Sequence, residues 1–330
     1  MIKINIESKL QRTKINLEDF QENFWNSIKS IKFNGKKVEG GDRVYEWNDF
    51  RIDTYSITIS EALRLICTNI NIRNYIERVL PNKVPNNDII DNWEQLLKYI
   101  VLLSPEKLEK ASLIRANLSV EEIKTIKKVF AYDDKRDGHI IPLFINLNFR
   151  TCFYCNRNYI GKFKNMDSIT RTTMSLDHFH QKGDFPLLAL SLYNLIPSCD
   201  VCNSRIKGSR DNIEQYMNPY SDSYDFHEKS KFTFVNQNSI KLESSDLKCR
   251  GYIRDFYINE IYQLHNQEVM EIIEKSRIFN GKYLEYISST TGESLENIQK
   301  YIFDVDKNEE ELDLLPLAKL KVDLLNLNEG

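Results

Sequence analysis

Two pairs of cysteines in the middle of the chain have the spacing of metal ligands. Cys152 and Cys155 form one Cys-x-x-Cys pair, and Cys199 and Cys202 form the other. Two intervening residues let both thiolates of a pair reach the same side of a turn, so that two such turns can close a tetrahedral zinc site. The alternative is two unrelated pairs of buried thiols. Of the two, we expect the site that binds Zn²⁺. A site closed by four thiolates has no open position for catalysis and is structural.

A second group of polar residues lies between and beside these cysteines. Asp177 and His178 are adjacent, and Asn194 and Asn203 follow. Adjacent side chains of a regular strand project to opposite faces, so Asp177 and His178 can serve one site only if the strand bends or ends there. Histidine is a common general base, and carboxylate and amide oxygens are hard ligands that suit Mg²⁺. The alternative is a surface aspartate beside a hydrogen-bonded histidine.

The order of these residues resembles the HNH endonuclease family, over the window from Arg150 to Arg210. The resemblance implies a ββα-metal finger, made of two strands and a helix, that hydrolyses phosphodiester bonds of DNA; RNA stays open as a substrate. The resemblance is carried, in chain order, by the two cysteine pairs and by Asp177, His178, Asn194, Asn203 and Lys207.

The resemblance also implies a role for each residue. It makes His178 the general base that activates water, and it places one Mg²⁺ or Mn²⁺ ion on Asp177 and Asn203. It makes Asn194 a scaffold residue that steadies the loop carrying the base. Oxygen ligands suit the catalytic ion and thiolates suit zinc, so the two metals separate by ligand type.

Positive charge gathers around this group. From Arg150 to Arg210 there are nine Lys or Arg against four Asp or Glu, whereas from Asp304 to the end there are three against eight. Since the net charge of the whole chain is −3, this pattern favours a local polyanion site over a surface that is basic throughout. The residues expected to contact nucleic acid, each with a solvated surface as its alternative, are His180, Lys182, Arg205, Lys207 and Arg210. His180 is also expected to share the strand face of His178.

Three segments are expected to position the site. TTMSLDHFH alternates and predicts a strand, and IPLFINLNFRTCFYCNRNYIGKF predicts two short strands around the first cysteine pair. FPLLALSLYNL has the length and the leading proline of a helix. The expected order is strand, strand, helix.

The flanking segments predict an α+β protein that is mostly helical. A helix capped by Ser60 and ended by Pro81, a helix in DNWEQLLKYIVLLS, a capping box at Ser119 and Glu122, and a strand pair between Val44 and Ile59 precede the finger. A hairpin in FTFVNQNSIKLES and helices in 257–276, near 283–287 and in 314–327 follow it. We expect a helical domain at 1–140, of partner-binding or regulatory role, the nuclease core at 141–212, and a hairpin-plus-helix region at 213–330.

Composition excludes several classes of protein. With 41% apolar and 28% charged residues the chain is typical of a globular protein, and it has no run of about 18 apolar residues that would span a membrane. We therefore expect a cytoplasmic protein without a membrane partner. Six cysteines in a chain of 330 residues do not suggest a disulfide framework, and in a reducing compartment paired cysteines more often bind a metal or do redox work.

The block from DHF to the second cysteine pair further resembles the PtuB-type HNH proteins of Septu and retron-associated anti-phage defence, which work with an ATPase partner. This resemblance implies an antiviral effector. Two alternatives are a non-catalytic zinc-binding module that recognises nucleic acid or protein, and a stand-alone restriction-type nuclease. The first has no need of Asp177, His178 and Asn203 together, and the second requires a DNA-reading motif that neither flank contains.

Overall fold

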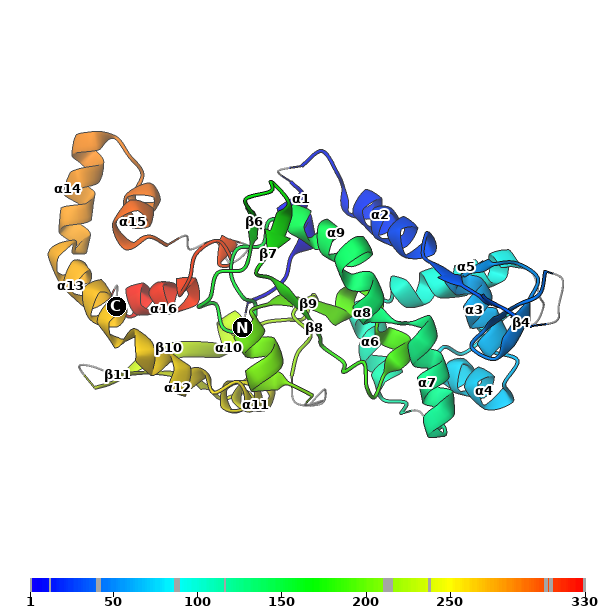
Figure 1. Cartoon of the computed structure of the whole chain (residues 1–330). Coiled ribbons are helices and arrows are strands. Elements are labelled where there is room, and N and C mark those ends of the chain that lie inside the picture. Colours follow the sequence, from blue (N-terminus) through cyan, green and yellow to red (C-terminus); the bar gives the residue numbers. More distant parts are fainter. Residues whose placement is uncertain are drawn as a thin grey trace. The chain divides into compact units, whose positions relative to one another are not determined.

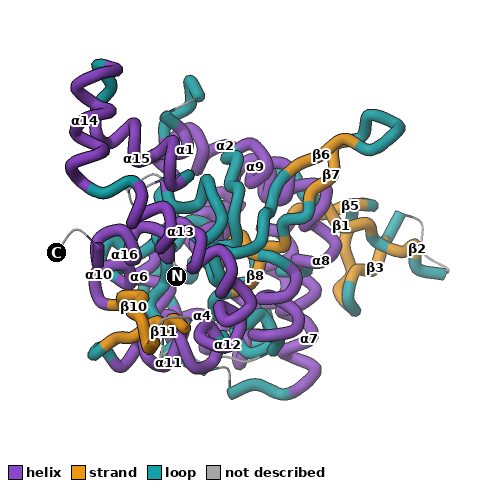
Figure 2. The backbone as a smooth tube through the Cα atoms, turned by 90° about the vertical axis from the view of Figure 1, so that its left-hand side faces the viewer, coloured by secondary structure: helices purple, strands orange, loops and turns teal. Residues whose placement is uncertain are grey.

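Figure 1 shows the computed structural model of the chain, which describes residues 2–11, 13–39, 43–85, 90–115, 117–209, 216–236, 239–305, 308 and 311–328. The chain divides into two compact units. The cysteine unit comprises Met1–Lys9, Asn148–Leu176 and Pro197–Gly330, and the histidine unit comprises Leu10–Leu147 and Asp177–Ile196. Helices predominate over strands in the described residues (Figure 2), which confirms the α+β, mostly helical class. The division into consecutive domains at 140 and 212 stays a prediction.

Local capping signals start several helices of the histidine unit. Ser119 and Glu122 form the predicted capping box of α7 (Val120–Val129), each side chain accepting a hydrogen bond from the backbone N–H of the other. The predicted helix in DNWEQLLKYIVLLS is α5 (Ile90–Val101). The unit also contains the helices α2 (Leu17–Lys29), α3 (Ile59–Ile66), α4 (Ile70–Val79), α6 (Pro105–Ser112), α8 (Tyr132–Lys135) and α9 (Ile141–Asn146), and a π-helical turn, η1 (Arg136–Ile140).

The prediction of one helix capped by Ser60 and running to Pro81 is wrong, because the structure has two helices there. Thr58, two residues before Ser60, caps α3 and forms a capping box with Glu61, while Ser60 is buried in the first turn. The chain leaves the helix at Cys67, and the side chain of Asn69 caps α4. A second cap inside an apolar repeat therefore splits the helix.

Short antiparallel strands complete the histidine unit. The predicted strand pair is confirmed as β3 (Tyr45–Trp47) and β4 (Phe50–Ile52), and β2 (Lys36–Lys37) pairs with the other edge of β3. In addition, β1 (Lys32–Asn34) pairs with β5 (Ser56–Thr58).

The cysteine unit is built around the predicted hairpin, which the structure confirms. β10 (Ser230–Asn236) pairs antiparallel with β11 (Ser239–Ser244), and Phe232 lies opposite Leu242 with both side chains buried. The predicted C-terminal helices are confirmed, and α11 and α15 join them. The helices of this unit are α1 (Ile6–Leu10), α10 (Phe226–Lys229), α11 (Leu247–Asp255), α12 (Ile258–Tyr262), α13 (Asn266–Ile278), α14 (Gly281–Thr291), α15 (Leu295–Phe303) and α16 (Ala318–Asn328), with a 3₁₀ turn, η6 (Gln263–His265).

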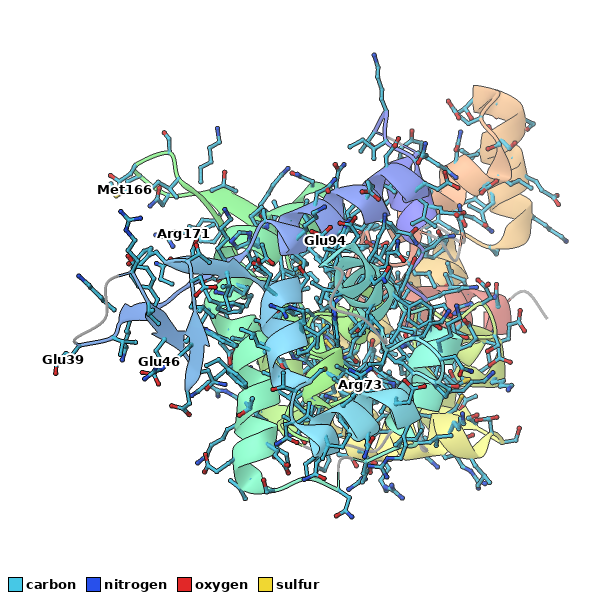
Figure 3. All side chains as sticks on the ribbon, turned by 90° about the vertical axis from the view of Figure 1, so that its right-hand side faces the viewer. Glu39, Glu46, Arg73, Glu94, Met166 and Arg171 are labelled. Atoms are coloured by element: carbon cyan, nitrogen blue, oxygen red, sulfur yellow. The ribbon has the colours of Figure 1, made fainter. Side chains whose placement is uncertain are left out.

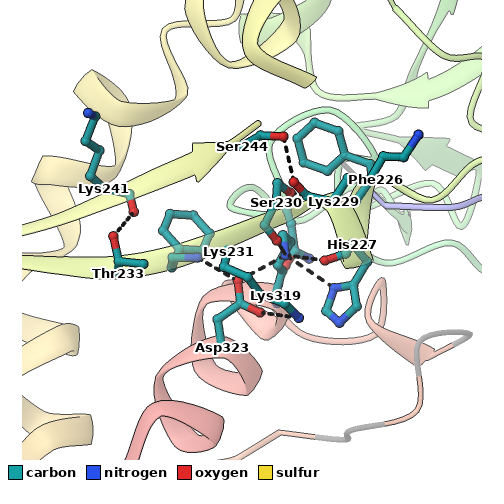
Figure 4. A network of polar contacts seen from close by, with 12 residues as sticks. Phe226, His227, Lys229, Ser230, Lys231, Thr233, Lys241, Ser244, Lys319 and Asp323 are labelled. Carbon is teal, nitrogen blue, oxygen red and sulfur yellow. Dashed lines mark hydrogen bonds and ion pairs between the residues drawn. The ribbon is translucent and has the colours of Figure 1, made fainter. Parts of the chain in front are cut away.

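A buried ion pair joins α16 to the hairpin (Figure 4). The ammonium of Lys319 lies 3.0 Å from the carboxylate of Asp323, one helical turn further along, and donates to the carbonyls of His227 and Ser230 at 3.2 and 2.8 Å. The same carboxylate accepts from the backbone N–H of Phe232 at 2.9 Å. Both charged side chains are almost completely buried, so each charge loses its hydration on folding. The ion pair and its hydrogen bonds compensate for that loss.

The segment before and around the first cysteine pair differs from its prediction. Two strands are predicted from Ile141 to Phe163, but the first six residues form α9, because Ile141, Phe144 and Leu147 recur every third residue and all lie buried. The cysteine pair is flanked by a single bridge between Thr151 and Tyr159. Beyond it lies a hairpin of β6 (Lys162–Lys164) and β7 (Thr170–Thr172).

In the segment that carries the histidines, the predicted strand is present and the predicted helix is not. The strand is β8 (Ser175–His178), which forms a two-stranded sheet with β9 (Leu195–Ser198); the boundary between the units falls inside both strands. FPLLALSLYNL forms two 3₁₀ turns, η2 (Pro186–Leu188) and η3 (Leu192–Asn194), and so the helix prediction is wrong. These residues are apolar and buried on nearly all sides, so no helical face is selected, and the side chains of Ser191 and Asn194 donate to the carbonyls of Ile100 and Leu188.

Candidate metal centre and histidine site

The four cysteines of the two pairs meet in the cysteine unit. Their Sγ atoms all lie within 4.8 Å of one another, and all four side chains are buried. In a zinc site with Zn–S bonds of about 2.3 Å, tetrahedral sulfur atoms are roughly 3.8 Å apart. The donor set and its spacing therefore fit one tetrahedral Zn²⁺, as the sequence predicts.

The charge of four thiolates requires a cation. Burial raises the pKa of Cys152. Hydrogen bonds from the other three cysteines and, more weakly, from Asn158 lower the pKa of Cys199; the amide of Asn158 lies 3.2 Å from the Cys199 sulfur. Like charges this close together in a buried site cannot all ionise unless a metal compensates them.

Side chains from distant segments hold the first knuckle in place. The hydroxyl of Tyr262 donates to the carbonyl of Cys155 at 2.7 Å, and that of Tyr252 donates to the carbonyl of Tyr154 at 2.6 Å.

Asn156, whose backbone is in the left-handed region with φ of 50°, directly follows the first knuckle. Its amide donates to the hydroxyl of Thr151 and the carbonyl of Leu312, both at 3.0 Å, and its side-chain oxygen accepts from the backbone N–H of Lys319 at 3.1 Å. The knuckle is therefore positioned by residues from three parts of the unit.

The second knuckle leads directly into a helical turn that carries Asn203. The π-helical turn η4 (Val201–Lys207) begins between Cys199 and Cys202. The backbone N–H of Asn203 donates to the carbonyl of Cys199 at 3.0 Å, and its carbonyl accepts from Gly208 at 2.8 Å. These bonds fix the backbone of Asn203 beside the cysteine cluster. Asn203 itself is half-buried.

His178 lies at the end of β8 in the histidine unit, with 7% of its surface exposed. Its Nε2 lies 3.0 Å from the carbonyl oxygen of Ala189. A carbonyl oxygen only accepts hydrogen bonds, so Nε2 carries the proton and, in the neutral ring, Nδ1 carries the lone pair. The ring of Tyr132 stands edge-on to the imidazole, with centroids 4.4 Å apart, and burial raises the pKa of Tyr132. The imidazole is therefore oriented from two sides.

Asn194 connects the segments on both sides of the histidine. Its side-chain oxygen accepts from the backbone N–H of His180 at 2.7 Å, and its amide donates to the carbonyls of His180 and Leu188 at 3.1 and 3.0 Å. Its own carbonyl accepts from the N–H of Phe179 at 2.8 Å. Asn194 is completely buried, and these contacts are those that a scaffold residue needs.

Asp177 and His178 are both buried although they are adjacent in the chain. Both lie within β8, at the end of which both faces of the strand are buried. Asp177 and His178 belong to the histidine unit and Asn203 to the cysteine unit. One divalent ion held by Asp177 and Asn203 stays a prediction.

His180 does not share the strand face of His178, and that expectation is wrong because the strand ends before it. Its side chain is completely buried, with its ring in edge-on contact with Phe179 and Phe185 at centroid distances of 5.0 and 6.0 Å. Its backbone, rather than its ring, supplies the contacts with Asn194. A contact between His180 and nucleic acid stays a prediction.

The predicted basic residues differ in exposure. The ammonium of Lys182 lies 2.6 Å from the carboxylate of Asp133 and over the ring of Tyr132, and Arg205 is exposed. Lys207 is buried, with 5% of its surface exposed. Arg210 lies outside the described residues. The nucleic-acid contacts of these residues stay a prediction.

Sequence reasoning missed Tyr132 and the surroundings of Arg157. The guanidinium Nε of Arg157 donates to His265 Nε2 at 2.8 Å, and His265 Nδ1 lies 2.9 Å from the carboxylate of Glu268, whose pKa this contact lowers. Arg157 lies 108 positions before His265, so no local pattern relates these two, whereas His265 and Glu268 are three positions apart. Among the described residues, no helix is long and apolar enough to cross a membrane.

Part of the chain is similar to a curated phage protein. The protein ea31 of Escherichia phage lambda is 25% identical over 134 residues, a match that covers 39% of this chain. The chain spans 44% of the length of that protein. No family model and no solved structure matches the chain.

Proposed function

We propose that this protein is a metal-dependent endonuclease of the HNH type that hydrolyses phosphodiester bonds of DNA. The observation that carries the proposal is the hydrogen bond between His178 Nε2 and the carbonyl of Ala189. This bond selects the tautomer whose Nδ1 can take a proton from water, which is the function of a general base.

The base needs a fixed position as well as a tautomer. The bonds from Asn194 to both sides of Phe179 hold the backbone that follows His178, and the ring of Tyr132 limits rotation of the imidazole. A base held in this way loses little freedom when the substrate binds, and misplacement by about 1 Å can reduce the rate roughly 100-fold. The two supports therefore belong to the proposed reaction.

Asp177 and Asn203 are the residues that would hold Mg²⁺ or Mn²⁺, through a carboxylate and an amide oxygen. When bound there, the ion supplies a Lewis acid that compensates charge on the scissile phosphate and on the leaving oxygen. The zinc cluster is structural in this proposal: it fixes the turn η4, which carries Asn203.

The proposed cellular role is that of an effector in anti-phage defence with an ATPase partner, and it rests on the resemblance to PtuB-type proteins alone. The neighbouring gene tests it: an adjacent ATPase or reverse transcriptase supports this role. A second candidate function is a non-catalytic zinc module. The buried Asp177-His178 pair speaks against it, because a zinc knot has no need of a buried, oriented imidazole.

The test is cleavage of plasmid DNA by the purified protein with Mg²⁺ or Mn²⁺, compared between two alanine variants. His178→Ala is expected to abolish cleavage while zinc content and circular dichroism stay as in the wild type. His139→Ala is the matched control, because the His139 Nδ1 also contacts a backbone carbonyl, that of Ser27, at 3.2 Å. Cleavage by the His178→Ala protein at the wild-type rate would refute the proposed base.

A further inference from the structure

The hairpin of β6 and β7, in the cysteine unit, buries almost none of its strand residues. Every residue of β6 is exposed, and two of the three residues of β7 are exposed. Its tip carries Met166, which is fully exposed (Figure 3), and Ile169, which is half exposed. Exposed apolar side chains on a protruding element are typical of interaction sites.

The hairpin is nevertheless well ordered by its own hydrogen bonds. At the tip, the side-chain oxygen of Asn165 accepts from the backbone N–H groups of Asp167 and Ile169, at 3.1 and 2.8 Å. At the root, the carbonyl of Gly161 accepts from the Thr172 hydroxyl at 2.9 Å and the Thr173 N–H at 3.0 Å. A preformed element loses little conformational entropy when it binds a partner.

The ladder of this hairpin leaves its positive charges uncompensated. Lys162 lies opposite Thr172 and Lys164 opposite Thr170, so one face carries two ammonium groups beside two hydroxyl groups. Arg171 lies opposite Phe163 on the other face. Between Gly161 and Thr173 the sequence has one acidic residue, Asp167, and it is at the tip.

A second exposed ladder of the chain shows the opposite arrangement. In the sheet of β2, β3 and β4, Glu46 (labelled in Figure 3) is paired with Lys36 on one side and with Arg51 on the other, so a carboxylate separates the two cations. Lys36, Lys37 and Arg51 are exposed like the three cations of the β6–β7 hairpin. An exposed basic strand therefore does not by itself imply a polyanion partner. The β6–β7 hairpin differs because no acidic residue lies opposite its cations in the ladder.

We propose that the β6–β7 hairpin binds double-stranded DNA as a two-stranded ribbon, an inference that rests on the proposed nuclease function and names its substrate as a duplex. A two-stranded ribbon fits the major groove of B-DNA, which is about 12 Å wide. Lys162, Lys164 and Arg171 contact phosphates, the threonine hydroxyls add hydrogen bonds to the backbone, and Met166 enters the groove. Phe163 is the one exposed aromatic ring of the hairpin, too few for the stacking by which proteins bind single strands.

The ribbon is connected directly to the zinc site. The backbone N–H of Cys152 donates to the carbonyl of Asn158 at 3.0 Å, and that of Ile160 donates to the carbonyl of Arg150 at 2.8 Å. The extended segment that leaves the first knuckle, bridged at Thr151 and Tyr159, is therefore followed by β6 two residues after Ile160. Loss of zinc loosens the base of the ribbon as well as the turn that carries Asn203.

The test measures binding of a labelled DNA duplex by fluorescence anisotropy without added divalent metal, over a range of salt concentrations. Lys162→Gln/Lys164→Gln/Arg171→Gln is expected to weaken binding at least 10-fold at low salt. The slope of log affinity against log salt should become shallower by about 2.7, which is 0.9 for each of three phosphate contacts. Met166→Ser should weaken binding severalfold and leave the slope unchanged, since it removes no charge.

Lys36→Gln/Lys37→Gln/Arg51→Gln is the matched control, because it removes the same number of positive charges from an exposed ladder. It is expected to bind the duplex as the wild type does. An equal loss in the control overturns the proposal, because the effect is then one of net charge. Tighter binding of the wild type to single-stranded DNA or to duplex RNA than to duplex DNA overturns it too. So does a hairpin variant that binds the duplex normally and loses binding only to vesicles of phosphatidylcholine and phosphatidylserine.

Failure of this inference is distinguishable from failure of the proposed function. Wild-type protein that cleaves DNA, with a hairpin variant that binds the duplex normally, refutes the ribbon and leaves the nuclease. Wild-type protein that never cleaves, with a hairpin variant that loses duplex binding, refutes the nuclease and supports the ribbon.

Discussion

The side-chain oxygen of Asn194 accepts a hydrogen bond of 2.7 Å from the backbone N–H of His180. The same side chain donates to the carbonyl of His180, so one amide satisfies both backbone groups of a buried residue. Such a pair of bonds fixes the backbone beside His178 without a regular strand or helix.

Asn194→Ala is expected to lower both stability and cleavage rate. It leaves the backbone groups of His180 buried without their partner, which costs about 1–3 kcal/mol. The matched control is Asn259→Ala, because Asn259 binds both backbone groups of Leu242 in the same way, at 2.7 and 3.3 Å. Thermal melting should show a loss in both variants, and only Asn194→Ala should reduce cleavage per folded molecule. Equal rates in the two variants would remove the positioning role of Asn194.

Cys199→Ser is expected to lose zinc and stability. A serine hydroxyl is a poor zinc ligand, and metal binding to a cluster of thiolates is coupled to folding. Zinc content by mass spectrometry and the melting temperature give the result. Cys249→Ser is the control, because Cys249 is a buried thiol outside the cluster. A stable Cys199→Ser protein with its full zinc content would argue against the four-cysteine site.

Lys319→Met is expected to destabilise the cysteine unit. It leaves the buried carboxylate of Asp323 without its nearest cation, and breaking a buried ion pair costs about 3–5 kcal/mol. The ammonium of Lys231, 3.7 Å from the other carboxylate oxygen, offsets part of that cost. The double variant Lys319→Met/Asp323→Leu should recover stability in urea denaturation. A double variant less stable than Lys319→Met alone would contradict the assigned cause.

The pH dependence of stability should contain a contribution from His227. Burial, and then the nearby charge of Lys319, lower the pKa of His227 to about 3. In the unfolded chain His227 has an ordinary pKa, so as pH falls the unfolded state binds a proton before the folded state does. The free energy of unfolding therefore keeps the full contribution of His227 above about pH 6.5 and loses it as pH falls toward 3. One such group changes stability by at most about 1.4 kcal/mol per pH unit. His227→Gln should show a weaker loss than the wild type between these pH values.

The sequence predicts those features that depend on local signals. Ser119 and Glu122 lie three residues apart and form their capping box whatever surrounds them. Alternation in FTFVNQNSIKLES requires only a turn and one buried face, and so the β10–β11 hairpin is confirmed. The cysteine cluster is confirmed because the spacing within each pair constrains both thiolates.

The remainder depends on contacts that no local pattern contains. FPLLALSLYNL is apolar on all sides, so its residues do not select a helical face, and the bonds of Asn194 to Leu188 and His180 impose two short turns instead. Thr58 rather than Ser60 caps α3 because the preceding strand β5 ends there. The support of His178 by Ala189 and Tyr132 joins three separate segments, and only the folded chain brings them together.

The contacts of Asn156 also set an order of events during protein synthesis. Leu312, whose carbonyl accepts from the Asn156 amide, leaves the ribosome 156 residues after it, and Lys319 follows later still. The first knuckle therefore exists without these groups while at least 156 further residues are made. Zinc taken up early meets four loosely held thiols, and the tight cage closes around the ion only after Leu312 and Lys319 have been made.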